Sequence, residues 1–326
     1  MKAFSGRYAL ACLLAVFAVA KADAQPASYP AKPVQILADS SAGSTPDVAL
    51  RFVTERLSKL WGQQILVVNR PGAGGSVAAR AATEATPDGY TLYQPVLSTF
   101  VSLRPAAPNV PLHVPKDFLP IGFVTENPMF IAVSPSLGVN SLAELIKLAQ
   151  QRPGEITYAT TGIGRLTHLT GELLQHQAKI KLLLVPYTGG PAHAISDVTT
   201  GRVNLIVEGY SGIAGGARSG AVKIIAVASA KRLPEFPDVP TVSETIPGFV
   251  ATGWAVLVAP LGTPEAIVRK VSEDLGKVTA QPELAAKLSK LGSYPNPMSA
   301  AAATAFVHKQ QQMWQPVLDE IAKKQK

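Results

Sequence analysis

The chain has 326 residues, a formal net charge of +8 at pH 7 and one cysteine, Cys12. Its basic residues are scattered, with no dense run and no interleaved aromatic residues, which argues against nucleic-acid binding. A chain of this length can bury enough apolar surface to fold without disulfides, and it is long enough for two domains.

The N-terminus has the layout of a secretory signal peptide. Lys2 and Arg7 precede an apolar run over residues 9–20, and Ala22-Asp23-Ala24 forms a small-x-small cleavage site. The alternative is a retained membrane anchor, but the run is short for a permanent transmembrane helix. We therefore expect residues 1–24 to be removed and the protein to be exported. Cleavage removes three basic residues and one acidic residue, which lowers the net charge from +8 to +6.

Cys12 lies inside this apolar run, whereas a lipid-modified cysteine would close it. The processed chain then contains no cysteine, and therefore no disulfide, no thiol nucleophile and no thiolate metal ligand.

The first part of the processed chain alternates predicted strands and helices. Residues 34–38 form a strand, and apolar residues at helical spacing over 48–60 predict a helix that Gly62 ends. The continuous apolar run at 65–68 is typical of a buried parallel strand. A glycine-rich loop, an alanine-rich helix and a third strand at 90–93 follow. This βαβαβ order predicts a parallel sheet with right-handed crossovers.

The alternation starts again after Asn127-Pro128, and a helix there opens on Ser141 and Glu144, spaced as in a capping box. After a proline-rich segment come another strand and C-terminal helices. A single long domain is the alternative, but a second complete sheet favours two lobes. The strands predicted in this part are 130–133, 156–160, 180–185, 203–207, 222–227 and 254–258.

Four predicted strand-to-helix turns share one composition, with glycine beside serine or threonine. Each lies at the carboxyl end of a strand, where open α/β sheets bind ligands. The first backbone N–H groups of a helix lack intrahelical partners and carry partial positive charge, so they suit a carboxylate or phosphate. The four turns are Ser41–Pro46, Pro71–Ser76, Thr160–Gly164 and Tyr187–Pro191.

Any one of these turns has an ordinary explanation, because α/β proteins need glycine in turns and serine or threonine as helix caps. Four of them on two sheets favour a ligand cleft between lobes. Nucleotide binding is not supported. Gly75 is followed by Ser76 and Val77, without the lysine of a phosphate loop or the third glycine of a dinucleotide loop.

Catalytic and metal-binding patterns are weak, so we expect no catalytic residue, no metal and no cofactor. Gly209–Ile213 resembles a nucleophile elbow but ends in isoleucine instead of glycine. The histidines show no metal-ligand spacing. His168, in the first turn after a glycine-rich loop, either pairs with Glu172 one helical turn later or contacts a ligand.

Asp39 directly follows a predicted buried strand. A carboxylate in this position is either a hydrogen-bonded structural group or a selector at the mouth of a pocket, and the sequence leaves both roles open.

Six segments carry a family resemblance: Tyr29–Pro33, Asn69–Gly75, Pro87–Leu92, Tyr158–Gly164 with His168 and Leu169, Val185–Tyr187, and Pro240–Glu244. In this order and spacing they resemble the periplasmic solute-binding receptors of tripartite tricarboxylate transporters, the TctC/Bug-like family. The resemblance covers nearly the whole processed chain.

This resemblance implies an α/β, type II periplasmic-binding-protein fold, with two mostly parallel sheets flanked by helices. Two lobes would close on a carboxylate-bearing solute, often with bridging water. Lobe 1 would comprise residues 25–125 and 251–326, and lobe 2 residues 126–250. The ligand-binding residues would be Asp39, Ser41, Gly43, Ser44, Thr45, Asp47, Gly72, Ala73, Gly74, Gly75, Ser76, Thr160, Thr161, Gly162, Gly164, His168 and Tyr187.

The first loop departs from the family pattern. The family loop usually begins with proline and an aromatic residue and contains Gly-Gly, whereas here Asp39-Ser40 stand first and Ser44 follows Gly43. We hypothesise that Asp39 disfavours a second ligand carboxylate and favours a neutral or cationic distal group. Calorimetric titrations of Asp39→Asn that left the ranking of ligands unchanged would contradict this.

We therefore expect a monomeric receptor that captures a small organic acid by lobe closure and delivers it to separate membrane transporter subunits. Helix N-termini and hydroxyl groups would neutralise the ligand without a buried lysine or arginine. The alternatives are a ligand-sensing subunit of a signalling system that uses the same fold and, third, an exported α/β hydrolase.

Overall fold

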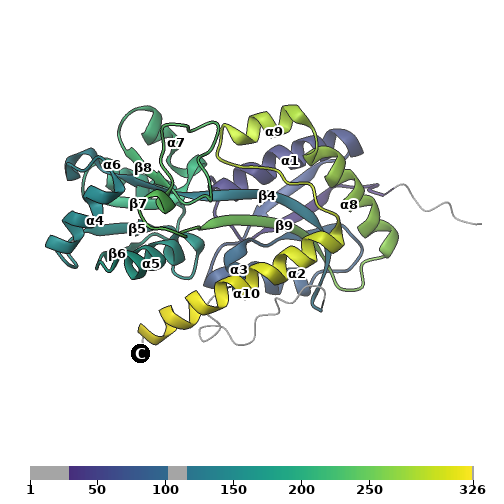
Figure 1. Cartoon of the computed structure of the whole chain (residues 1–326). Coiled ribbons are helices and arrows are strands. Elements are labelled where there is room, and N and C mark those ends of the chain that lie inside the picture. Colours follow the sequence, from purple (N-terminus) through teal and green to yellow (C-terminus); the bar gives the residue numbers. More distant parts are fainter. Residues whose placement is uncertain (1–28, 102–115, 325–326) are drawn as a thin grey trace, which may run out of the picture.

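The computed structural model describes residues 29–101 and 116–324. The expected signal peptide and Cys12 lie outside the described residues. Figure 1 shows two α/β lobes connected by two long strands, β4 (Phe118–Val133) and β9 (Thr252–Pro260). Lobe 1 holds β1 to β3, and lobe 2 holds β5 to β8. In the part of the chain that is described, no helix is both long enough and apolar enough to cross a bilayer.

The remaining elements alternate along the chain as the sequence predicts. In order they are β1 (Val34–Ala38), α1 (Thr45–Trp61), β2 (Ile65–Asn69), η1 (Ala73–Gly75), α2 (Ser76–Thr83), β3 (Thr91–Gln94), α3 (Leu97–Val101), η3 (Pro135–Leu137), α4 (Leu142–Gln151), β5 (Thr157–Thr160), α5 (Leu166–Ala178), β6 (Leu183–Pro186), α6 (Pro191–Thr199), β7 (Leu205–Gly209), α7 (Tyr210–Arg218), β8 (Lys223–Val227), η4 (Val242–Glu244), α8 (Glu265–Thr279), α9 (Pro282–Ser289) and α10 (Ala300–Lys324).

The predicted βαβαβ unit of lobe 1 is confirmed. Strand β1 pairs in parallel with both β2 and β3. Both faces of β1 are buried, since Ile36 packs in one core cluster and Leu37 in another. Helices α1, α8 and α9 cover one face of this sheet, and α2, α3 and α10 cover the other (Figure 1). Burial on both faces fits the apolar sequence of β1. The run at 65–68 was expected to be a buried strand, but it forms the outer strand β2, in which only Ile65 is buried and Leu66 is 44% exposed.

The two predicted sheets are not separate. Across the described strands the order is β2-β1-β3-β9-β4-β7-β5-β6, and β8 also pairs with β4. Strand β4 is 16 residues long and pairs antiparallel with β9, and its last part pairs antiparallel with β7 and β8. Parallel and antiparallel pairing are therefore more evenly mixed than the sequence suggested. The prediction covered only residues 130–133 of β4, because Pro120, Gly122 and Pro128 interrupt the strand pattern before them.

The local sequence determines where helix α1 begins and ends. Ser44 is its N-cap with extended backbone, a proline follows within the first turn, and Gly62 ends the helix in the left-handed conformation at φ 62°. Leu50, Val53 and Leu57 turn one face of the helix into the core. Each such buried side chain contributes on the order of 2 kcal/mol. The helix N-terminus is thereby held in place at the end of β1.

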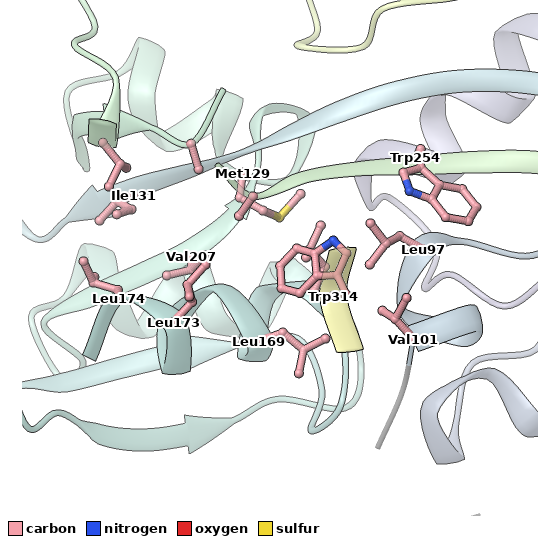
Figure 2. Close-up of a cluster of buried hydrophobic side chains, with 14 of the residues drawn as sticks. Leu97, Val101, Met129, Ile131, Leu169, Leu173, Leu174, Val207, Trp254 and Trp314 are labelled. Carbon is pink, nitrogen blue, oxygen red and sulfur yellow. The ribbon is translucent and has the colours of Figure 1, made fainter. Parts of the chain in front are cut away.

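The C-terminal helix α10 packs against both lobes. Figure 2 shows its Trp314 between Leu169 of α5 and Val101 of α3, and these side chains belong to one buried cluster. Trp254 of β9 borders the same cluster and stacks on Phe100, with ring centroids 5.4 Å apart. The core is thus continuous from lobe 1 to lobe 2.

Candidate ligand-binding site

A cavity of about 80 Å³ lies where the two lobes meet. It has room for several water molecules or a small ligand. Its wall comes from the turn after β1, the start of α3, the middle of β4, the start of β9, the turn after β5 and the end of β7. The residues that line it are Ser40, Ser41, Ser44, Pro46, Val96, Leu97, Ser98, Asn127, Met129, Thr161, Arg165, Leu166, Thr167, Glu208, Gly253 and Trp254.

Helix N-termini face this cavity, as the sequence predicts. Within the described residues, α1, α3 and α5 begin at residues that line it or directly follow one. Their first backbone N–H groups carry partial positive charge, which favours an anionic group at this point. The cavity therefore has the electrostatic character expected of a carboxylate site.

Strand order decides which loops reach the cavity. The inner strands β1, β3, β5 and β7 end at it, whereas β2 and β6 are the outermost strands of the sheet order. The predicted loops after β2 and β6 therefore do not line the cavity. The loop after β3 and the end of β7, at Glu208, line the cavity, and the sequence analysis named neither as part of the site.

The glycine-rich loop from Gly72 to Ser76 instead supports the cavity wall from behind. A Cβ atom at Gly75, where φ is +105°, would lie 2.6 Å from the Thr99 side chain and 3.0 Å from Oδ2 of Asp39. Gly72 and Ala73 are exposed, and Gly74 and Ser76 are half-buried. Close packing of backbone against Thr99 explains why glycine occupies position 75.

The loop after β6 lies at the margin of the site. The Tyr187 hydroxyl donates a hydrogen bond to Asp197 at 2.6 Å, within its own lobe. A Cβ atom at Gly190 would lie 3.3 Å from Cβ of Ser41. This loop thus touches the first loop across the lobes, without lining the cavity.

The loop after β1 contributes Ser41 and Ser44 to the cavity wall. The Ser44 hydroxyl donates to the Ser41 carbonyl at 2.6 Å, and the Gly43 N–H donates to the Asp47 carboxylate at 2.9 Å. Thr45 accepts a hydrogen bond at 3.2 Å from the Ser211 N–H of lobe 2. Asp47 and Thr45 therefore hold the loop, while the two serines face the cavity.

Asp39 is fully buried beside the cavity and does not line it. Its Oδ2 accepts hydrogen bonds from the hydroxyls of Tyr93, at 3.1 Å, and Thr99. Burial raises the pKa of this carboxyl, opposed by Arg165, whose guanidinium lies 3.7 Å from Oδ1, and by these hydrogen bonds. Of the two roles that the sequence left open, this position supports the hydrogen-bonded structural group.

In the loop after β5, too, one residue faces the cavity and others hold the loop in place. The Thr161 hydroxyl lines the cavity and donates to Oε2 of Glu208 at 2.8 Å. Thr160 is buried and bonded to Thr167, with hydroxyl oxygens 2.6 Å apart. The Gly164 N–H donates to Nδ1 of His168, 3.2 Å away.

Neither Gly162 nor His168 lines the cavity. The His168 ring is buried, with Nε2 3.8 Å from Oε1 of Glu172. Burial lowers the pKa of His168, and the nearby Glu172 opposes this shift. The histidine thus braces its own loop and helix, which supports the intrahelical pairing over ligand contact.

Arg165 is the first charged residue of the cavity wall that the sequence analysis did not name. Its side chain is 14% exposed, and its guanidinium donates to the Asp39 carbonyl and to Ser98 Oγ, the latter at 3.5 Å. A signal was present in the sequence. Arg165 is the N-cap of α5, where a cation is unfavourable unless something anionic offsets the helix dipole.

Glu208 is the second missed residue. It lies near the end of β7, is fully buried, and accepts hydrogen bonds from Thr161 and from the Gly209 N–H at 2.9 Å. Burial raises its pKa to about 7, against the lowering effect of these two hydrogen bonds. The sequence signal was a glutamate at the end of the apolar run Leu205–Val207.

Ser211, from the sequence that resembles a nucleophile elbow, donates its hydroxyl to the Leu291 carbonyl at 3.2 Å. Among the described residues, no cluster of three or more histidine, cysteine, aspartate or glutamate side chains is placed to hold a metal ion.

The chain is similar to known solute-binding proteins along most of its length. The family model for the tripartite tricarboxylate transporter family receptor, TctC, matches residues 49–323. A UPF0065 protein of Bordetella bronchiseptica is 35% identical over 283 residues, which cover 87% of this chain and 83% of that protein.

Two solved structures share the fold over most of their length. R. palustris Rpa4515 with adipate has a TM-score of 0.85 and 28% identity, covering 89% of this chain and 97% of that one. MatC from Rhodopseudomonas palustris with bound malate has a TM-score of 0.80 and 28% identity, covering 89% and 100%. The match of the receptor family model to most of the chain leads to one conclusion: the chain belongs to the tripartite tricarboxylate transporter receptor family.

Proposed function

We propose that this protein is a periplasmic receptor that captures a small organic acid between its lobes and delivers it to membrane transporter subunits. The observation that carries the proposal is the cavity between the lobes, where helix N-termini and Arg165 meet. Family membership supports a receptor role, and two related structures contain carboxylic acids, adipate and malate.

The lining chemistry suits a carboxylate. A guanidinium offers several N–H donors in a planar fork, and charge-assisted hydrogen bonds of this kind are stronger than neutral ones. The hydroxyls of Ser41 and Ser98 add donors on the lobe 1 side, and Ser44 also lines the cavity with its hydroxyl donated to the Ser41 carbonyl. Ser41, Ser44 and Thr161 therefore remain candidate ligand contacts from the sequence analysis, joined by Arg165.

Capture would occur by closure of the lobes around β4 and β9, with boundaries near residues 125 and 250. Direct contacts cross between the lobes, from Arg165 to Asp39 and from Ser211 to Thr45. A ligand that contacts both lobes binds the closed form better and so shifts the population towards it. The membrane subunits would distinguish this closed, ligand-bound form.

The test is a thermal-shift screen of the processed protein with mono- and dicarboxylic acids and amino acids, followed by calorimetric titration of each hit. A ligand that binds only the folded state raises the melting temperature. We expect at least one carboxylate to do so, and the matching compound without a carboxylate to have no effect. If no carboxylate shifts the melting temperature, the receptor proposal fails.

A further inference from the structure

The buried acidic side chains of the described chain differ in one respect. Asp39, Asp47 and Asp274 each lie near a cationic side chain, whereas Glu208 forms no ion pair within residues 29–101 and 116–324. The pairs are Asp39 with Arg165 at 3.7 Å, Asp47 with Arg51 at 3.1 Å, and Asp274 with Lys270 at 2.8 Å and Lys277 at 3.0 Å.

A buried carboxylate without a cation is unfavourable, because desolvation of the charge is not offset. The two hydrogen bonds that Glu208 accepts, from Thr161 and Gly209, offset only part of it. The group therefore either holds a proton or receives a cation from outside the chain. Its position on the cavity wall makes it accessible to a ligand.

Arg165 and Glu208 are the only ionisable side chains among the described residues that line the cavity. They form no ion pair with each other in the described structure, since Arg165 is directed to Asp39 and Ser98. The cavity thus presents one cationic and one acidic group at separate points of its wall. A ligand with one charge of each sign would complement both.

We propose that the ligand is a small zwitterionic acid, whose carboxylate binds at Arg165 and the adjoining helix N-termini and whose ammonium group binds at Glu208. This inference rests on the proposed receptor function and narrows its ligand class. A carboxylate has about four lone-pair positions, so Glu208 retains acceptors for an ammonium beside its two present hydrogen bonds. The sequence analysis expected Asp39 to disfavour a second ligand carboxylate and to favour a neutral or cationic distal group; in this proposal Glu208 has that role.

A dicarboxylic acid is the competing ligand. Its second carboxylate would meet Glu208, and two carboxylates sharing a site cannot both stay ionised without a large penalty. A dicarboxylate would therefore bind with uptake of a proton. The two ligand classes consequently respond to pH in opposite directions.

The experiment is calorimetric titration of the processed protein at pH 8 with matched acids. L-Alanine is compared with propionate, and 4-aminobutyrate with butyrate and glutarate, which separates α- from ω-amino acids. We expect at least one amino acid to bind about tenfold or more tightly than its ammonium-free analogues. In Glu208→Gln this ratio should fall to near one, while in the exposed control Glu84→Gln it should not change.

The wild-type protein supplies a second measurement that does not depend on a variant folding. Burial raises the pKa of Glu208 to about 7, so the carboxylate is mostly ionised at pH 8 and mostly protonated at pH 6. On going from pH 8 to pH 6, amino-acid binding should weaken by up to about tenfold, and glutarate binding should strengthen.

The outcomes separate this inference from the proposed function. If dicarboxylates bind more tightly than amino acids and keep that preference in Glu208→Gln, the zwitterion inference is wrong and the receptor function stands. If amino acids bind but their preference is the same at pH 6 and pH 8 and in the variant, Glu208 is not the ammonium site. If no acid binds at all, the receptor function itself fails.

Discussion

Asp39 and Glu208 are two fully buried carboxyl groups beside one cavity, and they differ in their partners. Asp39 directly follows β1 and has Arg165, Thr99 and Tyr93 around it. Glu208 lies near the end of β7 and has only a hydroxyl and a backbone N–H among its described partners. The difference lies in charge: Asp39 has a cation 3.7 Å away, although its Oδ1 accepts no hydrogen bond from the described residues, whereas both oxygens of Glu208 accept a hydrogen bond and no described cation pairs with it. Position beside a cavity therefore does not by itself make a residue a ligand contact.

Replacing Asp39 by alanine should have the largest effect on stability. It leaves the guanidinium of Arg165 without its carboxylate, and breaking a buried pair in this way costs about 3–5 kcal/mol. Urea unfolding measures the change. The matched control is Glu155→Ala, which removes an exposed pair with Arg152 and should change little. Equal effects in both variants would show that Asp39 is not a structural group.

The free energy of unfolding should depend on pH through Glu208. It should fall as the pH rises, whereas an acid in an ion pair makes it rise with pH. The folded pKa, about 7, is raised above the ordinary value of 4.5. The folded state therefore binds more protons between these values, and stability falls as the pH rises from 4.5 to 7. The loss is about 3 kcal/mol, and it is complete above pH 7.

This loss is isolated by unfolding wild type and Glu208→Gln at pH 5 and at pH 8. The variant should gain about 2.5 kcal/mol relative to wild type on going from pH 5 to pH 8, because a small part of the loss has already occurred at pH 5. A difference between the two proteins that stays constant across pH would mean that Glu208 titrates normally and is not desolvated.

Gly75→Ala should destabilise the Asp39 side of the cavity by about 2 kcal/mol. The substitution combines an unfavourable φ of +105° with a Cβ atom 2.6 Å from Thr99, which must then move away from Asp39. Gly138→Ala is the control, with a φ of +74° and no atom within 4 Å of its Cβ. This control should be destabilised by about 1 kcal/mol, because only backbone strain acts there. Thermal unfolding of both variants compares the two effects.

Arg165→Lys should weaken carboxylate binding by about tenfold. The charge is kept, but the planar fork that reaches Asp39 and Ser98 is lost. Calorimetric titration with the best acid from the screen measures the effect. Arg202→Lys alters an exposed pair with Asp197 and should leave binding unchanged. If both variants bind as wild type, Arg165 does not contact the ligand.

Much of the fold could be predicted from the sequence, because the relevant signals are local. The helix from Thr45 to Trp61 is determined by the proline in its first turn, its apolar spacing and Gly62. The long strands β4 and β9 were only partly predicted, since their continuity depends on pairing with each other rather than on their own pattern.

Only some of the predicted site residues line the cavity. Ser41, Ser44 and Thr161 line the cavity, but the loop from Gly72 to Ser76 does not. That loop and the loops after β1 and β5 are alike in composition, with glycine beside serine or threonine. They differ in whether the preceding strand lies inside the sheet or at its edge.

The sequence by itself therefore determined the α/β alternation, the helix starts rich in small polar residues and the family. These features rest on contacts between residues close along the chain or on resemblance over its whole length. Tertiary structure alone decided that β2 and β6 are outer strands, that Arg165 binds Asp39, and that Glu208 has no cation among the described residues. The physical reason is that strand order and the pairing of buried charges depend on residues far apart in sequence, such as Asp39 and Arg165.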